Sequence, residues 1–454
     1  MKVQHNGRKF TVEVTADGEG VVSHAGAALL AGTADRIGLT DALSRGLAPM
    51  RCRRGAHDPG RVVRDLAVML ASGGSHLSDL RAVRDQEPLF GAVASDATAW
   101  RTVEAIARDP ELLGALRGAR REAREGAWAA GAEPEGPLFV DLDPTLIEAG
   151  SEKEGAAGTF KGGYGFHPVL AFLDRPGDPC GGEPLAGLLR PGNAGANTVA
   201  DQIEVAEEAL EQLPADIAAE AEIVLRFDSA GATHGLLDWA REGRIRFSVG
   251  FDLTAPVREA IARIPAQRWA SALAQDGSPR GNGEVAEATD LIDLSGWPQG
   301  SRLIVRRERP HPGAQLSFTD ADGHRFQAIL TDREGDAAGL ERDHRARARC
   351  EDRIRCAKQM GLELLPFGDF EMNAVWMELV LIAGALVAWT DLLVLRGELS
   401  GLEPKRLRYR ALHTAGRLAF HARRATLRLE RRWPWAEELA GAFARLGQLP
   451  APAS

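Results

Sequence analysis

From Pro137 onward, short apolar runs alternate with turn residues and with helical stretches. The apolar runs cover residues 138–142, 169–173, 185–189, 223–227 and 245–249, and the helical stretches cover 197–213 and 235–242. Runs of this length predict buried strands, and their alternation with helices is typical of α/β domains. Because three strands follow one another before the first strand–helix unit, the sequence predicts a mixed sheet with helices packed against it.

The segments before this core predict a short hairpin and a group of helices. Residues 1–22 alternate polar and β-branched types with a turn at 16–18, which predicts a short β hairpin. Residues 23–130 have helical periodicity, and Trp100, Val103 and Ile106 are expected on one buried stripe. Arginines along the front edge make this all-helical domain a candidate DNA-binding module of the helix-turn-helix type.

A β-rich stretch at residues 252–333 breaks the rhythm of the core and predicts an insertion. Its strands are expected at 302–307, 315–319 and 326–331. The insertion divides the α/β core into a first part, 137–251, and a second part, 334–397, which begins with a charged helix. Residues 398–454 predict basic C-terminal helices and a tail rich in proline and alanine.

Composition favours a large folded protein of the cytoplasm. The 454 residues are 44% apolar and 26% charged, which predicts a large core and two or three domains. The longest apolar run, 375–395, is interrupted by Glu378 and Asp391, so its uninterrupted part is shorter than the roughly 20 residues that span a bilayer. We expect a buried core helix and no membrane partner. Four cysteines without a CxxC pair, and no apolar leader after Met1, favour a reducing compartment over secretion.

Charge is distributed very unevenly along the chain. The net charge is −9, yet residues 405–432 contain ten basic residues and one acid, so this segment carries +9 and the remainder −18. A local cluster of arginines on an acidic protein is typical of a contact with nucleic acid, because phosphates are neutralised locally. The segment therefore predicts a nucleic-acid contact.

Aspartates lie within or directly after two of the predicted core strands. Asp141 and Asp143 lie two positions apart and share one face of their strand, about 6.6 Å from each other along it. Asp228 directly follows the apolar run 223–227. A carboxylate in such a strand is costly to bury unless it leaves the sheet or meets a cation. Carboxylates at the ends of strands can converge on Mg²⁺, so these acids form a candidate metal site.

The charged helix that follows the insertion contributes a third element. His344, Arg347, Glu351 and Lys358 fall within an arc of about 60° when residues are placed at 100° intervals around a helix. One face of this helix therefore carries an acid between basic and aromatic side chains, and Gly361 is suited to end it.

Taken together, these motifs resemble the DDE transposases of bacterial insertion sequences, which have an RNase H-like catalytic domain. The resemblance rests on Asp143-Pro144-Thr145, on Asp228-Ser229-Ala230, on the β-rich insertion, and on the helix with Glu351. In the related group with such an insertion, this helix carries Tyr, two residues, Arg, three residues, Glu, six residues and Lys. The chain keeps the spacing in full, with His344 in the tyrosine position. The resemblance covers roughly residues 24–435.

The resemblance implies an enzyme that cleaves DNA hydrolytically and joins the freed 3′ ends to target DNA. Asp143, Asp228 and Glu351 would hold two Mg²⁺ ions, for which Mn²⁺ can substitute. Asp141 is the alternative first acid or a supporting metal ligand, and Asp143 is preferred because Thr145 follows it by two positions. The residues expected to contact DNA phosphates are His344, Arg347, Lys358, Lys161, Arg410 and Arg417.

The expected partners are double-stranded DNA, as terminal inverted repeats and as target, and a second copy of the chain in a synaptic homodimer. The expected location is the cytoplasm, in association with the nucleoid. Two alternatives remain open. The segment 139–145 also resembles the first motif of haloacid dehalogenase-like phosphatases, with Asp141 as nucleophile, Asp143 as acid/base and Asp369 as a metal ligand. A transposase derivative that binds DNA without catalysis is the other.

Overall fold

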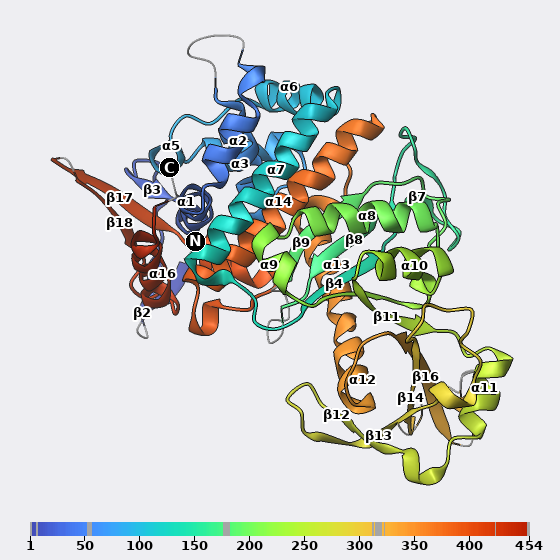
Figure 1. The fold of residues 1–454 in the computed structure, drawn as a ribbon. Helices are drawn as coiled ribbons and strands as arrows, with labels where there is room; N and C mark the ends of the chain where they lie inside the picture. The colour runs from blue at the N-terminus through green and yellow to red at the C-terminus, as the bar shows by residue number, and fades with distance from the viewer. Residues whose placement is uncertain are drawn as a thin grey trace.

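The computed structural model describes residues 2–5, 8–51, 57–175, 182–310, 313, 320–321, 323–422 and 424–451. At its centre lies a ten-stranded sheet with the order β12-β13-β14-β16-β11-β10-β4-β8-β9, and β15 pairs with β16 outside this path (Figure 1). The core strands are β4 Leu138–Pro144, β8 Val169–Leu173, β9 Glu183–Leu188, β10 Ile223–Phe227 and β11 Arg246–Phe251. Each corresponds to one of the five apolar runs.

The sheet is mixed, as the sequence predicts. β10 runs parallel to β4 and β11, whereas β8 runs antiparallel to β4 and β9. Every residue of β8 is buried, and both α8 Val199–Glu211 and α13 Arg349–Ala357 contact it. A strand that is covered on both faces has a continuous apolar sequence, which explains why the apolar run alone locates it.

The β-rich insertion extends the core sheet instead of forming a separate one. Its strands are β12 Ala270–Leu273, β13 Pro279–Glu287, β14 Arg302–Glu308, β15 Asp320–Ala321 and β16 His324–Thr331. β16 pairs antiparallel with both β14 and β11, so it joins the two halves. Figure 1 shows this half projecting from the core together with α11 Ala255–Ala262 and α12 Ala337–Arg345. The strand expected at 315–319 lies outside the described residues.

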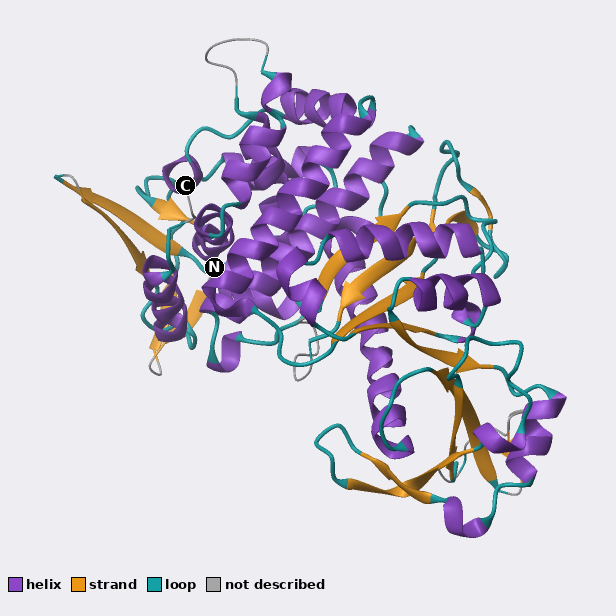
Figure 2. Cartoon of the chain, in the orientation of Figure 1, coloured by secondary structure: helices purple, strands orange, loops and turns teal. Residues whose placement is uncertain are grey.

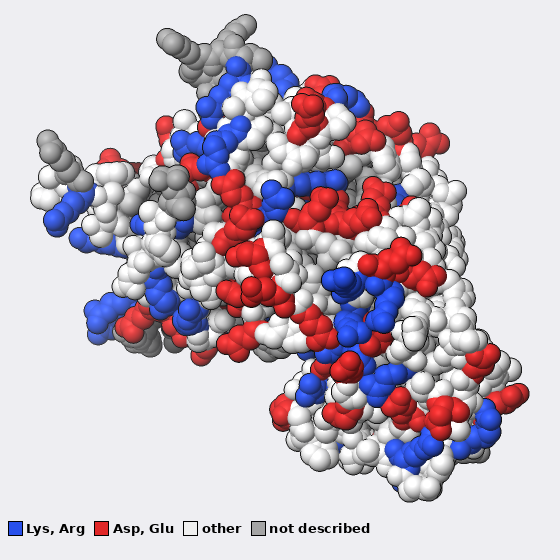
Figure 3. Space-filling model, viewed as in Figure 1, with Lys and Arg blue, Asp and Glu red and all other residues white. Residues whose placement is uncertain are grey.

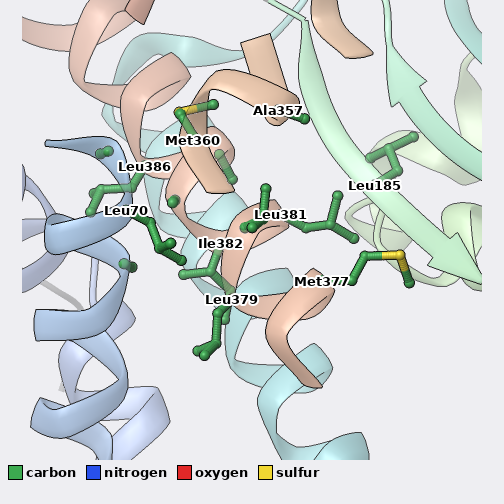
Figure 4. Close-up of a cluster of buried hydrophobic side chains, with 14 of the residues drawn as sticks. Leu70, Leu185, Ala357, Met360, Met377, Leu379, Leu381, Ile382 and Leu386 are labelled. Atoms are coloured by element: carbon green, nitrogen blue, oxygen red, sulfur yellow. The ribbon is translucent and has the colours of Figure 1, made fainter. Parts of the chain in front are cut away.

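The N-terminal helices pack around one long apolar helix, α14 Phe370–Val394 (Figure 2). They are α1 Ala28–Arg36, α2 Leu39–Gly46, α3 Pro59–Ala71, α4 Arg81–Arg84, α5 Glu87–Phe90, α6 Asp96–Ala107 and α7 Pro110–Ala127. Figure 4 shows Leu381 and Ile382 of α14 between Leu70 of α3 and Leu185 of β9. Among the described residues, α14 is the one helix long and apolar enough to cross a membrane, and most of its apolar window is buried inside the protein.

Local sequence signals set the starts of these helices. Asp58 caps α3 by accepting a hydrogen bond from the Gly60 amide at 2.9 Å, and Ser95 caps α6. The prediction that Trp100 faces inward is wrong, because its exposed fraction is 42%. The buried stripe of α6 instead contains Ala99, Thr102, Val103 and Ile106, and Trp100 follows Ala99 on the adjacent, solvent-facing side.

The basic C-terminal segment is largely a hairpin, which corrects the expected basic helices. β17 Gly416–His421 and β18 Arg424–Leu429 pair antiparallel, and β3 Val21–Val22 pairs with the start of β17. Apolar and basic residues alternate here with a period of two, which favours strands over helix. Helical turns remain at α15 Pro404–Leu407 and Arg408–Leu412, and α16 Ala436–Gln448 follows the hairpin.

The first hairpin also differs in detail from the sequence pattern. β1 Lys2–His5 pairs antiparallel with β2 Arg8–Thr11, so the chain reverses between His5 and Arg8 and not at 16–18. Residues 21–22 belong to the sheet with β17. The N-terminal and C-terminal segments of the chain are therefore held together by backbone hydrogen bonds.

Glu183 links the N-terminal helices to the central sheet. This fully buried residue of β9 accepts hydrogen bonds from Arg124 at 2.8 Å, Trp128 at 3.1 Å and Trp389 at 2.9 Å, and it pairs with Arg175. Burial opposes its ionisation, but the guanidinium groups hold the pKa of Glu183 below its ordinary value. One carboxylate therefore joins α7, α14 and β9.

We predict that Glu183→Gln lowers the free energy of unfolding by about 3–5 kcal/mol, because two buried guanidinium groups lose their counter-charge. Urea denaturation at neutral pH measures this change, since a depressed pKa keeps the interaction fully present there. The matched control is Glu122→Gln, which removes an exposed pair with Arg45 and should cost less than about 1 kcal/mol. Equal effects of the two substitutions would contradict the role of Glu183.

Candidate active site

Asp143 and Asp228 lie at the ends of neighbouring parallel strands. Asp143 is near the end of β4, and Asp228 directly follows β10. The register pairs Arg226 with Asp141, so Asp228 comes at the level of Asp143. Asp228 also caps the short turn that follows, accepting from the Ala230 amide at 3.0 Å. The two acids share the edge of the sheet where strands leave the core.

Glu351 reaches the same region from the first turn of α13, which packs on β4. It is exposed, and it makes no ion pair or hydrogen bond with the residues that the structure describes. Burial raises the pKa of Asp143 to about 6, and the nearby carboxylates of Asp228 and Glu351 add to this rise against the opposing charge of Arg347. The three acids therefore lie within one electrostatic neighbourhood.

Two further residues of the predicted helix face stand beside these acids. Arg347 pairs with Asp143, with 3.0 Å between Nη2 and Oδ1, and its own Nε is buried without a hydrogen-bond partner among the described residues. His344 lies 3.0 Å from the Ser248 hydroxyl through Nδ1. Burial lowers the pKa of His344 to about 3, and Arg347 and Arg226 lower it further. The ring is therefore neutral at physiological pH.

The other predicted phosphate contacts are divided between two places. Lys358 donates to the Leu146 carbonyl at 2.8 Å, just beyond the end of β4, and burial lowers the pKa of its amine. Lys161 is exposed and close enough to Lys358 to lower that pKa further. Arg410 and Arg417 belong instead to the C-terminal segment, on the other side of the molecule in Figure 1.

Asp141 has a different environment from Asp143. It is fully buried, and both of its oxygens accept from Arg226, at 2.6 and 2.8 Å. Arg353 of α13 donates to the same carboxylate at 3.0 Å. Asp141 therefore joins β4 to β10 and to the helix that carries Glu351.

A second buried acid completes this network. Asp174 accepts from Arg226 at 2.7 Å and from Arg349 at 3.0 Å, and it also pairs with Arg353. Although burial acts in the opposite direction, these guanidinium groups hold the pKa of Asp174 well below its ordinary value. Sequence reasoning missed the network, and the one local signal was Arg226, a charged residue inside an apolar strand.

The acids at the strand ends suit a divalent cation by their chemistry. Carboxylate oxygens are the ligands that Mg²⁺ takes, and Asp143, whose pKa is raised by burial and by the carboxylates of Asp228 and Glu351, gains from a nearby positive charge. No three His, Cys, Asp or Glu side chains are gathered as a ready ligand set within the described ranges. The positive charge that contacts Asp143 is the guanidinium of Arg347.

A cavity of about 320 Å³ opens beside the acids, between the core and the insertion. Asp228, Gly250, His344 and Arg347 line its core side, and residues of β14 and β16, including Arg306, line the other. Because β16 pairs with β11, the insertion is fixed at this edge of the sheet. The cavity is thus walled by both halves of the sheet.

The comparisons with known proteins identify the family of the chain. The family model described as "Transposase DDE domain group 1" matches residues 4–451, so the chain belongs to this family of DDE transposases. Among solved structures, the chain is similar to a piggyBac transposase in a synaptic complex with hairpin DNA. That likeness has a TM-score of 0.42 and 9% identity, and it covers 87% of this chain and 80% of the other. None of the curated proteins compared with the sequence matches it.

The family overturns the phosphatase alternative, and the geometry gives the physical reason. The proposed nucleophile, Asp141, has both oxygens bound by buried arginines. The proposed metal ligand, Asp369, caps α14 by accepting from the Met372 amide at 2.9 Å and pairs with Arg108. Both residues thus have structural roles in this fold.

We predict that Asp143→Asn stabilises the metal-free protein by about 1–3 kcal/mol at pH 7.5, the order set by its pKa shift. A pKa raised from 3.8 to about 6 means that the folded state loses stability as pH rises through this interval. The stability gained by Asp143→Asn should therefore be complete above the pKa that Asp143 has in the folded protein. It should vanish below the pKa that Asp143 has in the unfolded chain. Thermal denaturation with a chelator at several pH values measures it.

Asp141→Asn is the matched control on the same strand. It should destabilise the protein by about 3–5 kcal/mol, because it weakens the bonds of two buried guanidinium groups. If both substitutions destabilised the protein equally, the distinction between the two aspartates would be wrong.

Proposed function

We propose that the protein is a DNA transposase that acts on the ends of its own bacterial insertion sequence. It binds terminal inverted repeats, cleaves DNA hydrolytically, and joins the freed 3′ ends to target DNA by transesterification. The observation that carries the proposal is the position of Asp143 and Asp228 at the ends of neighbouring parallel strands, with Glu351 near enough to raise the pKa of Asp143, in a chain of the DDE transposase family. The mixed sheet supports an RNase H-like core.

Asp143, Asp228 and Glu351 are the residues that would hold two Mg²⁺ ions, with Mn²⁺ as a substitute. Such ions, when bound, activate the attacking oxygen and stabilise the leaving oxygen of a phosphodiester. Asp141 would not bind the ions itself, because its oxygens accept hydrogen bonds from Arg226 and Arg353. Its role would be to hold β4, and with it Asp143, in position.

The chemistry consists of two displacements at phosphorus. In the first, a water oxygen bonds to phosphorus while the bond to the 3′ oxygen breaks, and the strand end gains a 3′ hydroxyl. In the second, that hydroxyl attacks a target phosphodiester and displaces another 3′ oxygen, so one phosphodiester bond replaces another. The chain's own residues position the strand for both steps.

Arg347 is the residue best placed to grip the DNA strand beside the acids. Its Nε donor is unused, and a guanidinium binds phosphate oxygens as a fork. Lys358, fixed by the Leu146 carbonyl, and the exposed Lys161 add positive charge nearby. His344 offers a neutral ring in the tyrosine position, which suits stacking more than charge pairing.

The remaining parts of the proposal concern assembly and location. The helices within 23–130 and the basic C-terminal segment, with Arg410 and Arg417, are the candidate surfaces for the terminal repeats. Joining two ends requires a synaptic complex, for which we propose a homodimer. The protein would act in the cytoplasm, on the nucleoid.

We predict that Asp228→Ala and Glu351→Ala each reduce cleavage by more than about 100-fold, beyond the loss expected from supporting groups. The assay incubates the protein and Mg²⁺ with a plasmid that carries the element's ends and detects cuts at those ends. Asp352→Asn is the control, because this acid is next to Glu351 on α13 but pairs with Arg355. Undiminished cutting by either alanine variant would contradict the site.

The same assay separates the remaining alternative. Retention of end-bearing DNA without any cutting by the unmodified protein would support a silent, DNA-binding derivative. A parallel incubation with a phosphomonoester should release no phosphate.

A further inference from the structure

The hairpin β17–β18 is a ribbon with two unlike faces. Arg417 lies directly opposite Arg428 across the two strands, and His421 lies opposite Arg424. Because side chains alternate along a strand, these four residues share one face. All four are exposed. This face, which we call the basic face, contains no acidic residue.

The other face of the ribbon is apolar. Leu418 lies opposite Leu427, and Phe420 lies opposite Ala425. Leu418 is buried against the body of the protein, whereas Phe420, nearer the tip, is 70% exposed. The apolar face thus turns toward the body at its base, and the basic face turns toward solvent.

The arginines of the basic face lack the acidic partners that several exposed arginines elsewhere have. The side chains of Arg417, Arg424 and Arg428 form no ion pair or hydrogen bond with the described residues. Exposed arginines elsewhere pair with acids, as in Arg81–Asp85, Arg121–Glu125 and Arg268–Asp290. Like charges directly opposite each other on a sheet are destabilising. The free protein therefore keeps this face at a cost in stability.

The ribbon also stands away from the rest of the molecule. Only Gly416 and Arg417 of β17 pair with β3, so the outer part is a bare two-stranded ribbon, which is marginally stable in water on its own. Figures 1 and 3 show it projecting on the side opposite the insertion, with basic side chains along it. A bare, self-repelling ribbon gains most from a polyanion that lies along it.

We propose that the basic face of β17–β18 binds duplex DNA, as a contact separate from the cleft at Asp143, Asp228 and Glu351. An antiparallel two-stranded ribbon fits the major groove, which is about 12 Å wide. Arg417, Arg424 and Arg428 donate to phosphate oxygens there. The inference rests on the proposed function, in which duplex DNA is the partner, and it assigns the contact to one face of one hairpin.

The test uses the full-length chain and a short fluorescein-labelled duplex of arbitrary sequence, because phosphate contacts do not depend on sequence. Anisotropy titrations over a range of salt give the slope of log affinity against log salt. The triple variant Arg417→Gln, Arg424→Gln, Arg428→Gln should reduce the slope by about one unit per arginine. Its affinity at low salt should fall by at least about tenfold.

Two controls separate the basic face from general charge and from folding of the ribbon. The charge-matched variant Arg268→Gln, Arg280→Gln, Arg325→Gln removes the same charge from arginines of the insertion that pair with Asp290, Glu308 and Asp320, and it should leave the slope nearly unchanged. Phe420→Thr alters only the apolar face and should also leave DNA affinity unchanged. Without DNA, the melting temperature of the ribbon variant should equal or exceed that of the unmodified protein, because repulsion between Arg417 and Arg428 is gone.

The inference is overturned if the unmodified protein binds the duplex but the ribbon variant keeps its slope, or if the charge-matched variant loses as much. It is also overturned if Phe420→Thr lowers DNA affinity, the arginine variant does not, and sedimentation shows that Phe420→Thr converts a dimer into a monomer. That result would assign the ribbon to a second copy of the chain. Absence of cutting at the element's ends, with duplex binding intact, would count against the proposed function and not against the ribbon.

Discussion

The buried ion pairs behind the acids determine where the proposed catalytic residues lie. Asp141 and Asp174 bind Arg226 of β10 and Arg353 of α13 in the interior of the protein. Buried charges must be matched, so the strands and the helix can pack in few other ways. Asp141 is two residues from Asp143, and Arg353 is two residues from Glu351. The network therefore joins the strand that carries Asp143 to the helix that carries Glu351.

The front of the same elements has the opposite electrostatic character. Behind the sheet, acids and arginines are matched, but at its edge the carboxylates of Asp228 and Glu351 raise the pKa of Asp143, which pairs with Arg347. Such a like-charge group persists because the matched network holds the strands in place. The insertion contributes in a similar way, since the pairing of β16 with β11 fixes the second wall of the cleft.

Local patterns predicted the elements well where one face or both faces of an element are buried. The five core strands follow apolar runs, and Asp58 and Ser95, residue types that favour helix N-caps, cap α3 and α6. The C-terminal segment was predicted as helix, whereas the alternation of Leu418 and Phe420 with Arg417 and His421 is typical of the strands that the structure shows. Its order depends on β3, which lies some four hundred residues earlier in the sequence.

The sequence by itself determined the mixed sheet and the acids at its strand ends, because these depend on spacing along the chain. The prediction of one helix with His344, Arg347, Glu351 and Lys358 on a single face is wrong, because a 3-10 turn at Ala346–Ala348 separates α12 from α13 and Lys358 follows the end of α13. The sequence could not separate Asp141 from Asp143, since residues two apart on a strand share one face. The packing of α13 gives the two residues different environments: Arg353 donates to Asp141, whereas Asp143 pairs with Arg347 near Asp228. The partners of buried charges are distant in sequence, so only the tertiary structure pairs them.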